Sequence, residues 1–140
     1  MNTGYRRGGT AGLLVGLLLA VFAVAFQMIG VAAALPEAMR SLDAAALYPW
    51  AFSMPVMGML ASILVAGRHC DRHGPLVSMG LGFGVMFLGL IAGSFATDVW
   101  LLLAARLVQG LGAGALNLSL FVVIALAFPA GRRPAVLAML

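Results

Sequence analysis

The chain alternates between long apolar runs and short polar segments, and this pattern predicts a series of membrane-spanning helices. Apolar residues fill four runs with few interruptions, at residues 11–35, 44–66, 76–96 and 99–128. A helix needs roughly 20 apolar residues to cross a hydrocarbon core about 30 Å thick. Each run is therefore long enough for one crossing. The polar segments between and after the runs are short, at residues 36–43, 67–75, 97–98 and 129–134.

The two ends of the chain add to this picture. Residues 135–140 are apolar again, and we interpret them as the start of a fifth transmembrane helix. On this interpretation the chain is a fragment of a longer protein. Residues 1–10 carry Arg6 and Arg7 ahead of the first run, as in a signal peptide, but the run is longer than a usual signal core. We expect the first run to stay in place as a transmembrane helix.

Composition excludes a soluble domain. Of the 140 residues, 64% are hydrophobic and 9% are charged, and a soluble protein of this size needs a far more polar surface. The net charge of +4 comes from arginines. Nucleic-acid binding would require them to cluster on one face, yet all except Arg106 lie in the polar segments at the ends of apolar runs. We predict a lipid bilayer, and no nucleic acid, as the surroundings of this chain.

The distribution of arginine predicts the orientation in the membrane. Cytoplasmic loops of membrane proteins carry an excess of Lys and Arg. Segments 1–10, 67–75 and 129–134 hold six arginines, whereas segment 36–43 holds one and segment 97–98 none. Both ends of the chain are therefore predicted to be cytoplasmic, with segments 36–43 and 97–98 outside, in a multi-pass protein of the plasma (inner) membrane.

Glycines spaced four residues apart are typical of helices whose backbones approach closely in lipid. Three such pairs occur in the runs: Gly12 with Gly16, Gly80 with Gly84, and Gly110 with Gly114. We expect close helix contacts at these pairs. The expectation is strongest in the fourth run, where Gly112 lies between the members of the pair.

Segment 67–75 is the most specific motif of the sequence. Gly67, Asp71, Arg72 and Gly74 follow the spacing of the loop between helices 2 and 3 of the major facilitator superfamily, which this segment resembles. The basic residues that the family pattern has after the second glycine are absent here. The resemblance implies a loop that docks against the C-terminal half of a transporter and holds its outward-facing state. The alternative is an ordinary polar turn on the cytoplasmic side.

The same segment holds His69, Cys70 and His73, which raises the question of a metal site. Three ligands at most are available, and they are crowded into five positions. The family pattern already accounts for the segment, so we predict no metal and no cofactor.

A second motif lies in the fourth run. Arg106, Gln109, Gly110, Gly112 and Ala113 follow the pattern Arg-x-x-Gln-Gly-x-Gly-Ala. This pattern resembles the helix 4 signature of the drug:proton antiporters within the same superfamily. A charged residue inside an apolar run costs about 2.5 to 3.5 kcal/mol on insertion scales and is a candidate for function.

A helix rotates by about 100° per residue, so Arg106, Gly110, Ala113 and Asn117 share one face. We expect this face, together with Gln109, to line a substrate cavity. The alternative is that Arg106 extends to the outer headgroups, since it lies about 10 Å from the start of its run.

The end of the first run completes the resemblance. Residues 27–36, which end in Ala-Leu-Pro, are similar to helix 1 of the same antiporters, where an aspartate often stands at the position of Gln27. Gln27 lies about 12 Å from the outer end of its run, close to the depth of Arg106. We hypothesise that the two face each other across the cavity. The alternative is that Gln27 bonds a neighbouring helix.

These observations predict an all-α membrane protein that resembles the first part of the N-terminal half of a major facilitator superfamily transporter. The expected function is alternating-access transport of a small molecule, with efflux of drugs or metabolites as the activity. Its partners would be a small-molecule substrate and the missing C-terminal part or another membrane chain. No nucleophile–base pair is present, so an enzyme is not expected. Two alternatives remain: a non-transporting four-helix protein that packs against a partner chain, and a small oligomeric transporter.

Overall fold

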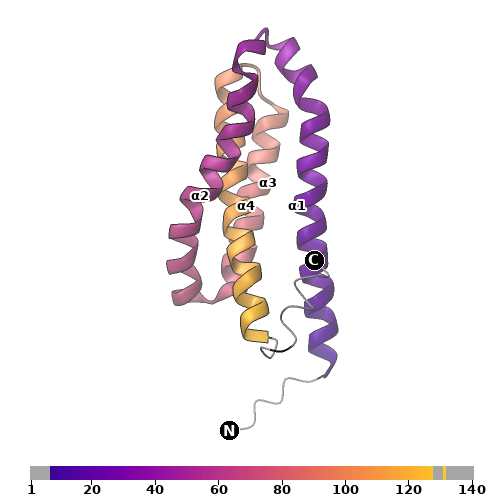
Figure 1. The fold of residues 1–140 in the computed structure, drawn as a ribbon, viewed down its shortest axis with the longest axis vertical. Helices are drawn as coiled ribbons and strands as arrows, with labels where there is room; N and C mark the ends of the chain where they lie inside the picture. Colours follow the sequence, from indigo (N-terminus) through magenta and orange to yellow (C-terminus); the bar gives the residue numbers. More distant parts are fainter. Residues whose placement is uncertain (1–6, 128–130, 132–140) are drawn as a thin grey trace.

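The protein is an up-and-down bundle of helices in which neighbouring segments are antiparallel (Figure 1). The computed structural model describes residues 7–127 and residue 131. The elements are α1 (Arg7–Ser41), a short 3-10 turn η1 (Ala45–Leu47), α2 (Tyr48–His73), α3 (Pro75–Ser94) and α4 (Val99–Ala127). No strand occurs in these described ranges.

Four of these helices are long and apolar enough to cross a membrane. Many large apolar side chains on their outer faces are exposed, including Phe22, Leu64, Leu88 and Leu126, as expected for surfaces that contact lipid. The predicted all-α membrane fold with four transmembrane helices is confirmed. The predicted start of a fifth helix at residues 135–140, and segment 129–134 apart from Gly131, lie outside the described residues.

The first helix ends later than predicted. Segment 36–43 was expected to be a loop, but α1 continues through Pro36 to Ser41. A proline inside a helix removes one backbone donor, and membrane helices tolerate this loss. Leu35 and Met39, on either side of Pro36, are both buried. Their packing requires the helix to continue.

Both ends of the second helix lie later in the chain than its predicted bounds of 44–66. It begins at Tyr48, after η1, and it continues to His73. Most of segment 67–75, expected to be a loop, is therefore helical. Arg72 and His73 lie in the last turn, where positive charge is favoured by the helix dipole. Gly74, with φ 87° and ψ 157°, then reverses the chain, and Pro75 starts α3 at a position where a missing N–H costs little.

Helix α4 forms the centre of the bundle, because α2 and α3 both pack along it. Glycines on two sides of α4 allow this approach. A Cβ on Gly110 would collide with the backbone of Pro55 on α2, and a Cβ on Gly112 would lie 2.6 Å from the carbonyl oxygen of Gly82 on α3. Gly114 meets α2 at Met59 in the same way.

The close contacts expected at Gly16, Gly80 and Gly84 do not occur among the described helices. A Cβ at Gly80 or at Gly84 would have no neighbour within 4 Å, and the same holds for Gly16. Close contact at Gly80 and Gly84 was therefore a wrong expectation, because this face of α3 points away from the described helices. The surroundings of Gly12 lie outside the described part of the chain.

Helix α1 stands apart from the other three over much of its length (Figure 1). Two apolar clusters hold it. One contains Leu35, Met39, Ala44, Ala51, Leu102 and Leu103. The other joins Val21 of α1 to α3 and α4 and is built on Leu120, Val123 and Ile124. The candidate site lies between these two clusters.

Candidate functional site

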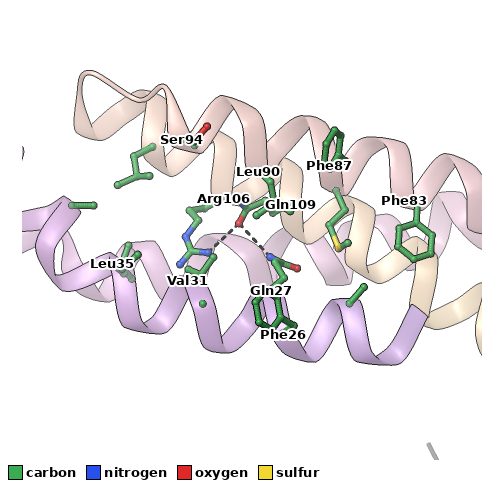
Figure 2. A pocket seen from close by; sticks show the side chains of 17 residues that line it. Phe26, Gln27, Val31, Leu35, Phe83, Phe87, Leu90, Ser94, Arg106 and Gln109 are labelled. Atoms are coloured by element: carbon green, nitrogen blue, oxygen red, sulfur yellow. Dashed lines mark hydrogen bonds between the residues drawn. The ribbon is translucent and has the colours of Figure 1, made fainter. Parts of the chain in front are cut away.

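Three polar side chains meet in the space between α1 and α4. Arg106 Nη1 donates a hydrogen bond of 3.0 Å to Gln109 Oε1, and Gln27 Nε2 donates to the same oxygen at 3.4 Å (Figure 2). Gln27 and Arg106 therefore approach each other as hypothesised from the sequence, but Gln109 bridges them.

This arrangement fixes how the two amides are oriented. A guanidinium is only a donor, so Gln109 must present its oxygen to Arg106. Gln27 must then present its nitrogen to that oxygen. The remaining oxygen of Gln27 is buried and has no hydrogen-bond partner among the described residues. A buried acceptor without a partner is unusual and calls for an explanation.

Arg106 is enclosed by the protein. Its side chain is 5% exposed and that of Gln109 is 3% exposed. The alternative that Arg106 extends to the headgroups is therefore wrong. It points instead toward α1, beside Val31 (Figure 2).

The positive charge of Arg106 has no carboxylate beside it in the part of the chain that the structure describes. The sequence has four acidic residues, and they lie near the ends of helices, at Glu37, Asp43, Asp71 and Asp98. None of them lines a cavity at this site. Within the described residues, the partner of the guanidinium is the neutral amide of Gln109. An uncompensated buried charge is costly, so this site is suited to a ligand that carries negative charge.

Two apolar cavities flank the polar contact. The larger, about 510 Å³, lies between α1, α3 and α4, and the smaller, about 390 Å³, lies between α1, α2 and α4. Ligand sites of drug-sized molecules are typically about 300 to 1,000 Å³. Four residues line both cavities, namely Gln27, Val31, Arg106 and Gln109.

The smaller cavity contains the helix face that the sequence singled out. Arg106, Gly110, Ala113 and Asn117 all line it, with Gln109. Asn117 also borders a third cavity of about 190 Å³ toward the other end of α1.

The larger cavity includes residues that were not predicted from sequence patterns. Its α3 wall contains Phe83, Phe87, Leu90 and Ser94, and Phe26 of α1 lies opposite (Figure 2). Apart from Ser78 and Ser94, helix α3 has no polar side chain, so little in its sequence distinguishes a cavity wall from a lipid-facing side. An apolar position becomes informative only when its neighbours in space are known.

The motif residues between α2 and α3 lie at the opposite end of α4 from Arg106. Asp71 and Arg72 are exposed, and no ion pair joins them within the described part of the chain. Gly67 is half-buried near Leu118, and Gly74 forms the turn. The structure brings these four residues near one another but away from the cavities.

The histidines and the cysteine of this segment point to different neighbours. The rings of His69 and His73 stack with their centroids 4.4 Å apart. The buried Cys70 Sγ lies 3.5 Å from Ser119 Oγ of α4. The cysteine thus belongs to the α2–α4 interface and not to a cluster with the histidines.

Comparison with known proteins decides the family. The sequence profile of the Major Facilitator Superfamily matches residues 17–140. The chain belongs to the Major Facilitator Superfamily. The resemblance seen in the sequence is confirmed, and the chain belongs to a family of multi-pass membrane transporters. No solved structure matches it.

Three curated relatives show the range of the family around this chain. An uncharacterized MFS-type transporter of Mycobacterium tuberculosis is 33% identical over 86% of this chain and 21% of its own length. The efflux pump dotC of Dothistroma septosporum is 30% identical over 74% of this chain and 18% of its own length. The multidrug resistance protein MdtL of Shigella flexneri is 34% identical over 64% of this chain and 23% of its own length. The chain thus spans about a fifth of the length of these relatives.

Proposed function

We propose that this protein takes part in the export of a small molecule by alternating access, and that its substrate binds in the cavities beside Arg106. The observation that carries this proposal is a buried arginine that lines two drug-sized apolar cavities and has no acidic partner among the described residues. Two relatives are named as an efflux pump and a multidrug resistance protein, which supports export as the direction of transport.

We propose that helix α1 moves during transport and so opens or closes access to the site. It is held by apolar clusters at two places and contacts α4 sparsely between them, so a small rotation changes access to the cavities without breaking the α2–α3–α4 unit. In transporters of this type, substrate binds near the bilayer midplane between two halves that rock against each other. Further helices, beyond the four described, would close the site in the complete transporter.

The turn between α2 and α3 is the proposed conformational latch. With the N-terminus cytoplasmic, as the arginine distribution predicts, this turn lies on the cytoplasmic side. Asp71 and Arg72 are exposed there and available to dock on the second half of a transporter. Docking would hold the cytoplasmic side closed.

Coupling to protons requires a group that takes up and releases a proton near neutral pH, and no carboxyl group or histidine lines the two cavities among the described residues. Gln27 stands where an acid would be expected from the antiporter resemblance, and an amide does not take up a proton at neutral pH. We propose that any coupling acid lies outside α1–α4.

An accumulation assay tests the export function. Cells that lack their major efflux pumps would express the protein in its native length or the Arg106→Gln variant, and uptake of fluorescent anionic, neutral and cationic compounds would be compared. Export predicts lower accumulation of at least one compound with the parent protein and a smaller effect with the variant. Equal accumulation of every compound with and without the protein would refute the proposal.

A further inference from the structure

We propose that the substrate of this site is an amphipathic organic anion whose charged group pairs with Arg106 and whose apolar body fills the larger cavity. This inference rests on the proposed transport function and adds the chemical class of the substrate. Three features of the site support it: the positive charge of Arg106, the unused N–H donors of its guanidinium, and the shape of the larger cavity.

The site carries an unbalanced positive charge at Arg106. Arg106 is 5% exposed, and a buried cation is stable when it is paired. The two glutamines that surround it are neutral. A cationic substrate would bring a second positive charge into the same low-dielectric space, where like charges repel strongly. A monoanion would neutralise the site.

The guanidinium of Arg106 has unused hydrogen-bonding capacity. A guanidinium has five N–H donors in a planar fork that suits carboxylates and phosphates. One donor of Arg106 is used, by Gln109. The guanidinium borders both cavities, so the others are open to a ligand there. Gln27, whose buried side-chain oxygen has no hydrogen-bond partner among the described residues, lines the same two cavities.

The larger cavity has apolar and largely aromatic walls. Phe26, Phe83 and Phe87 line its walls, and Leu90 lies near Arg106 (Figure 2). Its volume of about 510 Å³ accommodates an apolar or aromatic body. Phe83 and Phe87 lie to one side of the contact between Arg106 and the two glutamines, and Leu35 and Ser94 lie to the other side (Figure 2). A charged group at Arg106 would leave the apolar body of a ligand along the phenylalanines. The site therefore selects for a molecule with one charged end and one apolar end.

Binding of three matched naphthalene compounds tests the inference. Purified protein in its native length would be titrated with 2-naphthoate, 2-naphthamide and 2-naphthylmethylammonium, which share a body and differ in charge. We expect the anion to bind most tightly. Arg106→Gln should weaken its binding by about 10- to 100-fold, leave the amide nearly unchanged, and be partly rescued by Arg106→Lys.

Two further variants keep the test decisive. Gln109→Glu preserves the size of the side chain but places a carboxylate against Arg106, so it should weaken naphthoate binding by about 10-fold or more even if Arg106→Gln does not fold. Arg40→Gln is the control, because Arg40 is exposed and paired with Glu37 at the end of α1. It should leave all three affinities unchanged.

Several outcomes would overturn the inference. Tighter binding of the cation, or naphthoate binding that is insensitive to both Arg106→Gln and Gln109→Glu, would show that Arg106 does not select an anion. Displacement of naphthoate by phosphatidylglycerol at lower concentrations than by other carboxylates would identify a lipid headgroup as the occupant. Export of cations without any naphthoate binding would refute the anion site alone. Naphthoate binding without export of any compound would refute the transport function alone.

Discussion

Gln27 on α1 donates a hydrogen bond of 3.4 Å to Gln109 on α4, at the level where the two helices enclose cavities on both sides. Polar contacts between membrane helices are worth about 0.6 kcal/mol on average and up to about 1.7. Such a contact positions α1 without locking it. Because the same oxygen of Gln109 accepts from Arg106, the position of α1 and the availability of the guanidinium are linked.

Replacing Gln27 by aspartate should make anion binding depend on pH. Above the pKa of the new carboxyl group, its negative charge would neutralise Arg106 and exclude a second anion. Below that pKa, the neutral acid would leave Arg106 available. Affinity for 2-naphthoate should therefore fall by about 10-fold or more as pH rises through this pKa, relative to the parent protein. Titrations at several pH values measure the effect.

The matched control for this experiment is Gln27→Asn, which keeps an amide and adds no titratable group. Its pH profile should have the same shape as that of the parent protein, even if its affinity differs. If Gln27→Asp and Gln27→Asn give the same profile, Gln27 does not lie within electrostatic reach of the bound anion.

Packing at the centre of the bundle should be sensitive to a single methyl group. Gly110→Ala places a Cβ against the backbone of Pro55, which cannot move as freely as a side chain. Overpacking of this kind costs about 1 to 3 kcal/mol, so the free energy of unfolding in detergent should fall by that amount. Gly80→Ala is the control, since nothing lies within 4 Å of its Cβ. A loss of stability at Gly80 equal to that at Gly110 would contradict the described packing.

The turn between α2 and α3 should require glycine. Gly74 has φ 87° and ψ 157°, a region that is essentially restricted to glycine and costs other residues about 1 to 3 kcal/mol. Gly74→Ala should lower the unfolding free energy by this amount. At Gly67, in the helix, a Cβ would make an ordinary contact of 3.7 Å with Leu118, so Gly67→Ala should be close to neutral. Equal effects at the two positions would mean that the turn has another conformation.

The sequence predicted the number of helices and their approximate bounds, because apolar runs of this length have few alternatives to a membrane crossing. It failed at the helix ends. Pro36 was interpreted as the start of a loop, yet the buried Leu35 and Met39 keep the chain helical there. The charged residues of segment 67–75 were likewise assigned to a loop. A helix end can carry charge when it extends beyond the apolar layer, and composition does not distinguish the two cases.

For the candidate site, the sequence predicted the residues that differ in polarity from their surroundings and missed the others. Gln27 and Arg106 were identified because polar side chains stand out in an apolar run, and their proximity was inferred from equal depth. The bridging position of Gln109 depends on the rotation of α4 and could not be read from spacing. Phe83 and Phe87 carry no polar signal, so their place in the cavity wall emerges only from the packing of α3 against α4.

The central claim is that a transported molecule occupies the space between α1 and α4, and a cysteine at Val31 tests it most directly. Val31 lines both cavities, whereas Ala33 is exposed on α1 and lines neither. Each would be replaced by cysteine in a Cys70→Ser background, and the rate of reaction with a water-soluble maleimide would be measured in membranes. We predict that Val31→Cys reacts, that a transported compound slows its reaction by several-fold, and that Ala33→Cys does not respond. A rate at Val31→Cys that is unaffected by every transported compound would contradict the claim.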